Sequence, residues 1–162
     1  MIIVKRMETA QELEGKARVH YTAWQETYRG LLSDDYLAGM SYERCLVGAR
    51  RWQDNVLVAK DGERVIGFVS YGVSRDRKMP DAGEILGIYL LEEYQGQGIG
   101  YRLMHAAMEQ MTEYKTIFLW VLMGNRKAIR FYERYGFRYE GEEKKMLIGG
   151  VVIEQRMVYH RN

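Results

Sequence analysis

The sequence predicts an α+β fold, with one central, twisted sheet that is mixed but mostly antiparallel and has helices on both faces. Three observations predict it. Short apolar runs alternate with longer segments whose apolar residues recur every three or four positions. Turn signals join some of the short runs into hairpins, and a glycine-rich loop leads another into a helix. The predicted order is β-α-α-β-β-β-α-β-α-β-β.

Length and composition narrow the class of protein. The 162 residues suit a single domain, which we expect to span residues 1–162. A net charge of +2 is too balanced to favour nucleic acid or an anionic membrane as a partner. The lone Cys45 excludes an internal disulfide and a cysteine-based metal centre, and we expect no metal site. Because neither a signal peptide nor an apolar span of ~20 residues is recognisable, a cytoplasmic protein is expected.

The amino-terminal segment predicts a strand and then a long helix. Ile2–Arg6 is apolar enough for a first strand. Thr9 and Glu12 form a capping box, so a helix is expected to begin there and to end near Tyr28. Its predicted buried face consists of Leu13, Ala17, Tyr21, Trp24 and Tyr28.

Two serines and a hairpin signal mark the next elements. Ser33 is placed to cap a short second helix, and Ser41 to cap another that ends near Trp52. The runs Val56–Lys60 and Val65–Ser70 flank Asp-Gly, a strong signal for an antiparallel hairpin. The polar segment from Ser74 to Gly83 then predicts a long loop.

The stretch that follows carries most of the functional information. Glu84–Leu91 is a short apolar run typical of a strand covered on both faces. Three glycines follow within Gln95–Gly100, and Ile99, Leu103 and Ala106 then repeat at helical spacing. Because glycines allow a sharp turn and the first N–H groups of a helix lack intrahelical partners, this loop predicts an anion site.

Two common phosphate-binding loops do not fit this anion site. The dinucleotide fingerprint needs glycine where Tyr101 or Leu103 stands, and an acidic residue ~20 positions later, where the sequence is apolar. The nucleoside triphosphate loop needs Gly-Lys-Ser/Thr at its end, which is missing after Gly96 and Gly98. The anion site therefore belongs to another class.

The remainder of the chain predicts a strand, a helix and a hairpin. Thr116–Leu122 is the strand, and Asn125 and Gly136 are suited to begin and end the helix. Phe137–Glu142 and Val151–Tyr159 read as the final hairpin, which turns at a Gly-Gly pair.

Two motifs resemble one family. Gln95-x-x-Gly98-x-Gly100 resembles the Q/R-x-x-G-x-G/A loop of the GNAT N-acetyltransferases, and the residues from Asn125 to Phe137 match their N-x-x-A-x-x-F-Y-E-x-x-G-F pattern. Tyr132 also lies on an apolar helical face, which alone is typical of a core residue. The two motifs stand in the family's order and are separated by one helix and one strand, which favours a functional role for Tyr132.

The resemblance implies a cofactor site for acetyl-CoA as co-substrate. In the family the central strand splays from its neighbour, so the backbone of Ile88, Tyr89 and Leu90 would bind the pantetheine arm, which Asn125 would also touch. One backbone N–H would polarise the thioester carbonyl. The loop residues that would hold the pyrophosphate are Gln95, Gly96, Gln97, Gly98, Ile99, Gly100 and Tyr101.

The resemblance also implies two catalytic roles. Tyr132 would lie near the sulfur and act as general acid, because a phenol of pKa ~10 can protonate a leaving thiolate whose conjugate acid has a pKa of ~8.5. The base is less determined, since the strand Thr116–Leu122 carries no carboxylate. Glu84 is the candidate base, relaying a proton through water; the alternative is an exposed residue at a strand end.

The expected function is transfer of acetyl from acetyl-CoA to a primary amine by direct attack, with no acyl-enzyme. Alternatives are a non-catalytic acyl-CoA-binding sensor or interaction module, and a structural domain whose glycine loop is only a turn. The acceptor stays open among small amines, polyamines, antibiotics and peptide amino termini. Residues of the first helix that are candidates to line its pocket are His20, Trp24, Glu26, Tyr28 and Arg29. The edge of the final hairpin is a candidate surface for a homodimer.

Overall fold

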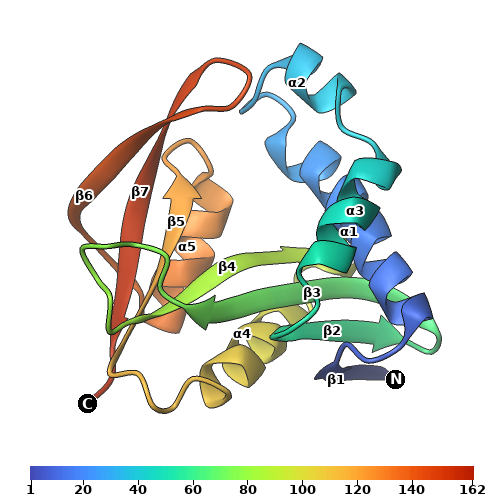
Figure 1. Cartoon of the computed structure of the whole chain (residues 1–162), viewed down its shortest axis with the longest axis horizontal. Coiled ribbons are helices and arrows are strands. Elements are labelled where there is room, and N and C mark those ends of the chain that lie inside the picture. The colour runs from blue at the N-terminus through green and yellow to red at the C-terminus, as the bar shows by residue number, and fades with distance from the viewer.

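The computed structural model describes residues 1–162, and its elements follow the predicted order (Figure 1). The strands are β1 (Ile2–Arg6), β2 (Val56–Asp61), β3 (Arg64–Val73), β4 (Gly83–Leu90), β5 (Thr116–Leu122), β6 (Arg138–Leu147) and β7 (Val151–His160). The helices are α1 (Ala10–Tyr28), α2 (Asp34–Ala38), α3 (Tyr42–Arg51), α4 (Ile99–Glu109) and α5 (Arg126–Tyr135), with a short 3-10 turn η1 (Glu92–Tyr94). Ser33 and Ser41 cap the two short helices α2 and α3, as predicted.

The seven strands form one sheet in the order β1-β2-β3-β4-β5-β7-β6. Every neighbouring pair is antiparallel except β4 and β5, which run parallel. The sheet twists strongly, with α1 above and α4 below the strands β2 to β4 in Figure 1. The predicted mixed, mostly antiparallel sheet with helices on both faces is therefore confirmed. No helix is long and apolar enough to cross a membrane.

The capping box at the start of α1 forms as predicted. The Thr9 hydroxyl accepts from the Glu12 amide at 3.1 Å, and the Glu12 carboxylate accepts from the Thr9 amide at 3.4 Å. Burial alone would raise the pKa of Glu12, but hydrogen bonds from Lys5 and from the amides of Glu8 and Thr9 outweigh it and lower the pKa to about 2. One carboxylate thus ties β1 to α1.

The buried face of α1 is rotated from the predicted one. Ala17 is buried as expected, whereas Leu13, Tyr21, Trp24 and Tyr28 are only half-buried because they pack toward α2 and α3. The helix turns Gly15, Val19 and Ala23 to the sheet instead. A Cβ at Gly15 would lie 2.6 Å from Cγ2 of Val65, so this glycine allows a close approach that apolar periodicity cannot reveal.

Both hairpins form, but the last one is longer than predicted. Gly62 turns β2 into β3 with φ +59°. Strand β6 begins after Phe137, as expected, and continues past Glu142 to Leu147, where it pairs with Val151. Its second half is rich in charged residues because β6 is an exposed edge strand, so an apolar pattern ends too early.

Strand β4 is covered on both faces only at its start. Gly83, Glu84 and Ile85 are buried, and the rest of the strand is half-buried. Ser70 pairs with Gly87 and Tyr71 with Ile85, which leaves Leu86 as an extra residue and makes a β-bulge in β4. The expectation of a fully covered strand was therefore wrong, because beyond its first residues β4 leaves its neighbour β5.

Candidate active site

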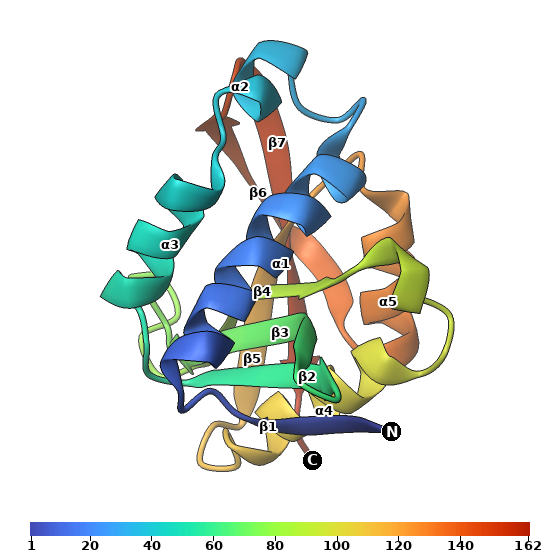
Figure 2. The ribbon, with the colours of Figure 1, turned by 90° about the vertical axis from the view of Figure 1, so that its right-hand side faces the viewer.

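The site is built around the divergence of β4 from β5. The two parallel strands pair only at Gly83 with Ile117 and Glu84 with Phe118, and then separate (Figure 1). From Ile85 onward no strand pairs with the β5-facing edge of β4, so its backbone N–H and C=O groups are available to an extended ligand. Ile88, Tyr89 and Leu90 lie on this unpaired part, between α1 on one side and α5 on the other (Figure 2).

The glycine loop opens α4 as an anion site. Gly98 is the N-cap residue at φ +81°, a conformation that favours glycine, and no side chain caps the helix. The first internal hydrogen bond runs from the Arg102 amide to the Gly98 carbonyl, so the N–H groups of Ile99, Gly100 and Tyr101 have no partner in the chain. A Cβ at Gly98 would meet no atom within 4 Å. Space and free donors together fit a phosphate group.

Two side chains fix this loop relative to its neighbours. Gln95 donates from Nε2 to the Leu90 carbonyl at 3.0 Å, and its Oε1 accepts a hydrogen bond from Lys127 of α5. Asn125 caps α5, because its Oδ1 accepts from the Ala128 amide at 3.3 Å. The predicted cofactor residues of the two motifs therefore meet at the wide end of the gap between β4 and β5. Gln97 and Tyr101 are exposed at its rim.

Tyr132 lies on the inner face of α5. Its residue exposure is 9%, its ring packs edge-on against Phe131 and Phe137, and its hydroxyl makes no hydrogen bond within the chain. Burial, with a smaller contribution from nearby Tyr28, raises the pKa of the Tyr132 phenol. The phenol therefore keeps its proton at neutral pH, as a proton donor must.

Glu84 lies where β4 and β5 begin to part. It is 2% exposed, so the alternative of an exposed strand end is wrong. Both carboxylate oxygens accept from Arg75: Oε1 from the amide at 3.0 Å and from Nε at 3.3 Å, and Oε2 from Nη2 at 2.7 Å. These three hydrogen bonds tie the β3–β4 loop to β4, and the role of Glu84 as a base stays a prediction.

A cleft of about 690 Å³ opens beside this point, lined by Glu84, Leu86 and Trp120 near the gap, by residues 75–78 of the β3–β4 loop, and by β6 and β7. Sequence reasoning missed its members on β7, Glu154 and Arg156. Alternating polar residues in a final strand are typical of an exposed face. The one sequence signal for a shared site was that Glu154 and Arg156, two residues apart in a strand, lie on the same face of it.

Three of the five predicted acceptor residues come together. His20, Trp24 and Tyr28 surround Tyr89: the His20 ring stacks 6.0 Å from the Tyr89 ring, and the Tyr28 and Tyr89 hydroxyls are 2.9 Å apart. Burial and nearby Lys16 lower the pKa of His20 to about 4, so the imidazole is neutral.

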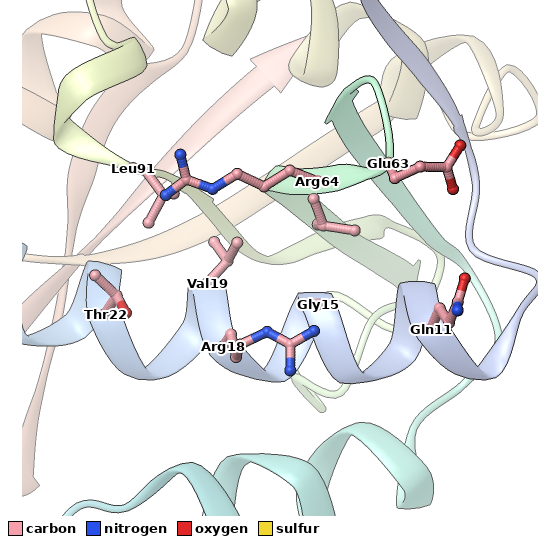
Figure 3. Close-up of a pocket in the computed structure, with 9 residues that line it drawn as sticks. Gln11, Gly15, Arg18, Val19, Thr22, Glu63, Arg64 and Leu91 are labelled. Atoms are coloured by element: carbon pink, nitrogen blue, oxygen red, sulfur yellow. The ribbon is translucent and has the colours of Figure 1, made fainter.

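The other two predicted acceptor residues lie apart from this group. Glu26 accepts from the Glu92 amide at 3.1 Å, at the η1 turn, and Arg29 is exposed just past the end of α1. A second hollow, of about 190 Å³, lies between α1 and β3 and shares no lining residue with the cleft (Figure 3). It presents Arg18 and Arg64 rather than a group that handles protons near neutral pH.

Comparison with known proteins identifies the family. The profile of the acetyltransferase (GNAT) family matches residues 14–137. The chain belongs to the GNAT acetyltransferase family. Its relatives and structural neighbours include N-acetyltransferases, one of them solved with coenzyme A. The chain is therefore an acetyl-CoA-dependent N-acetyltransferase.

Two relatives and one solved structure illustrate how this chain resembles other N-acetyltransferases. An uncharacterised N-acetyltransferase of Bacillus subtilis, YuaI, is 30% identical over 91% of this chain and 87% of its own length. The spermine/spermidine N(1)-acetyltransferase of the same organism is 32% identical, over 48% of this chain and 55% of that protein. The PaiA N-acetyltransferase of Thermoplasma acidophilum, solved in complex with coenzyme A, is 25% identical, with 99% of each chain covered and a TM-score of 0.76.

Proposed function

We propose that this protein transfers the acetyl group of acetyl-CoA to a primary amine by direct attack, with one domain spanning residues 1–162. The observation that supports it most is the placement of a proton-donating phenol, Tyr132, beside a gap between strands whose wide end carries a free helix N-terminus. A thioester and its phosphates need these two features, and no acyl-enzyme is required because no nucleophilic Ser or Cys is assigned there.

The cofactor would be held mainly by backbone groups. Ile88, Tyr89 and Leu90 would pair with the pantetheine arm in the manner of an added strand, and Asn125 would contact it from the start of α5. The pyrophosphate would lie on the N–H groups of the glycine loop and of the first turn of α4, from Gly96 to Tyr101. Gln95, whose own N–H donates to the Glu92 carbonyl, would hold the loop in place through its side chain. None of these contacts would involve the acceptor, so they would bind acetyl-CoA without selecting the amine.

Bound acetyl-CoA supplies a thioester carbonyl that the amine nitrogen attacks. The C–N bond forms and the C–S bond breaks, and Tyr132 gives its proton to the departing sulfur. A backbone N–H of the β4 edge would stabilise the charge on the carbonyl oxygen. The amine must reach the thioester as a neutral nitrogen. Glu84 is the base predicted from the sequence, and Glu154 is a second carboxylate in the same cleft.

Calorimetric titration with acetyl-CoA, followed by a thiol-release assay over a panel of amines, tests the proposal. Gly98→Glu should weaken binding by 100-fold or more, because it puts a carboxylate where the pyrophosphate lies, in a backbone conformation that disfavours a side chain. Gly62→Glu is the matched control, since Gly62 also has positive φ and open space but lies in the β2–β3 turn.

Each outcome separates the candidate functions. Binding that Gly98→Glu removes and Gly62→Glu keeps, together with thiol release, supports the enzyme. Binding without turnover of any amine would favour the non-catalytic acyl-CoA-binding module, and absence of binding by folded protein would reject both. Three expectations from the sequence stay predictions. The enzyme is expected to need no metal, to have no nucleic-acid or membrane partner, and to offer the β6 edge as a surface for a homodimer.

A further inference from the structure

Two charged side chains in the cleft have fewer partners than their burial calls for. Glu154 and Arg156 lie on one face of β7, two residues apart, and pair with Leu122 and Trp120 of β5. Their Cα atoms are therefore about 7 Å apart along the strand. A single small molecule can contact both side chains.

Arg156 has a surplus of hydrogen-bond donors. Its side chain is 12% exposed, yet only one of the donors of its guanidinium has an acceptor in the chain, where Nη1 meets Oδ2 of Asp76 at 3.2 Å. Its Nε is enclosed and has no acceptor at all. A guanidinium carries five N–H donors, and leaving most of them unpaired in a desolvated site is unfavourable, so an anionic partner would stabilise it.

Glu154, in contrast, has few hydrogen-bond donors near its carboxylate. Its side chain is 18% exposed and its one close donor is the Lys144 ammonium at 3.7 Å, whereas Glu84, in the same cleft, accepts three shorter hydrogen bonds. The nearest cation, Lys144, is 3.7 Å away and lies over the Trp120 ring at 4.2 Å. Burial raises the pKa of Glu154, and the charges of Lys144 and Arg75 oppose this only in part. A cationic group with hydrogens to donate would satisfy it.

The charges of the cleft, with Glu154 and Arg156 included, are balanced. Five acidic residues, Asp76, Glu84, Glu142, Glu143 and Glu154, face five basic residues, Arg75, Arg77, Lys78, Lys144 and Arg156. A polyamine carries several positive charges and would need a surplus of carboxylates that this cleft lacks. A ligand with one positive and one negative group leaves the balance unchanged.

We propose, resting on the acetyl transfer proposed above, that the acceptor is a small amino acid whose carboxylate pairs with Arg156 and whose amine faces Glu154. Glu154 takes the extra proton of the ammonium group, which frees the nitrogen to attack. The nitrogen releases its next proton to solvent as the C–N bond forms, while the sulfur takes the proton of Tyr132 as the C–S bond breaks. Arg156 contributes by binding, since it touches the carboxylate and not the reacting atoms.

Matched acceptors test the carboxylate. Amino acids are compared with their decarboxylated amines and their amides: alanine with ethylamine and alaninamide, phenylalanine with phenethylamine and phenylalaninamide, lysine with cadaverine and lysinamide. At least one amino acid should have a kcat/KM ten-fold or more above both of its partners. Equal rates, a preference for amides or a preference for cadaverine or spermidine would overturn the proposal while leaving the acetyltransferase intact. No turnover of any amine would overturn both.

Variants test the two residues separately. Arg156→Gln should lower kcat/KM for the amino acid to that of its decarboxylated amine in the same variant, which removes the preference. Because Arg156 also holds the β3–β4 loop through Asp76, Asp76→Asn serves as a second variant that frees the loop but keeps the guanidinium, and it should retain the preference. Arg44→Gln, an exposed charge change on α3, is the control for charge alone. A preference that survives Arg156→Gln, or is lost equally in Asp76→Asn, would count against the assignment.

A pH series tests Glu154. The charged and titratable groups that face it are Lys144 of β6, Arg75 of the β3–β4 loop, Glu84 of β4 and Tyr28 of α1. Glu154→Gln should lower kcat/KM by about 100-fold at pH 7 and much less at pH 9.5, where the amine arrives without its extra proton. A deficit of equal size at both pH values would show that Glu154 shapes the cleft and does not take the proton.

Discussion

The two halves of the proposed active site are built from different kinds of groups. The proposed cofactor half consists of backbone groups from one continuous stretch, the β4 edge, the glycine loop and the first turn of α4, closed by the cap of α5. The proposed acceptor half consists of side chains from the β3–β4 loop and from β4, β5, β6 and β7. The first half needs glycine and a helix end, and the second needs matched charges.

The difference explains how one fold serves many acceptors. A site made of backbone depends on local geometry that a few positions dictate, such as Gly98 with its positive φ. A site made of distant side chains can change one residue at a time without altering the sheet, because each of its members only has to lie on the correct face of its strand. The cofactor half is thus fixed by fold, and the acceptor half is free to vary.

The largest expected effect lies where the two halves meet. Tyr132→Phe should lower kcat by about 100-fold and change the KM for acetyl-CoA less than two-fold, because it removes the proton for the leaving sulfur and keeps the packing of the ring. Tyr135→Phe is the matched control: it is also on α5, its hydroxyl meets His105 Nδ1 at 3.3 Å, and burial raises its pKa to about 12. Rates measured by thiol release that fall equally in both variants would contradict the general-acid role.

The same contrast determines what the sequence could predict. The positions of the glycine loop, Asn125 and Tyr132 at helix ends and on a helix could be predicted because each motif is contiguous and carries local signals such as a helix cap or a tight turn. Most element boundaries followed from caps and hairpin turns for the same reason. The buried face of α1 was mispredicted because Gly15 contributes no apolar side chain, and the length of β6 because an edge strand carries charges.

The cleft could not be predicted because its charges converge only in three dimensions. Arg75 meets Glu84 across the β3–β4 loop, and Asp76 meets Arg156 across eighty positions of sequence. Each residue alone has the sequence context of an exposed surface charge. Burial, which gives Glu154 and Arg156 their chemistry, is a property of the assembled sheet.

An intermediate effect concerns stability on the acceptor side, where polar groups are buried. The folded-state pKa of His20, about 4, is below the 6.5 of an exposed imidazole, so the unfolded chain binds a proton between these values and the folded chain does not. Stability should therefore fall as the pH drops from 6.5 toward 4, by about 2 kcal/mol between pH 7 and 5.

Urea unfolding at the two pH values measures this loss. His20→Phe, which keeps an aromatic ring against Tyr89, should remove the pH dependence, and His105→Gln, an exposed change on α4, should keep it. The low pKa of Glu12, about 2, contributes stability that is lost only below pH 4.5, outside this window. An unaltered slope in His20→Phe would assign the effect to another group.

The smallest expected effect separates the two carboxylates of the cleft. Glu84→Gln keeps the shape of the side chain but weakens three hydrogen bonds to Arg75, so it should lower the free energy of unfolding by about 1 to 2 kcal/mol. The pH dependence of kcat/KM should remain that of the wild type, because the three hydrogen bonds from Arg75 give the Glu84 side chain a structural role. A deficit that grows as the pH falls, with stability unchanged, would return the role of base to Glu84 and leave Glu154 as the amine's electrostatic partner alone.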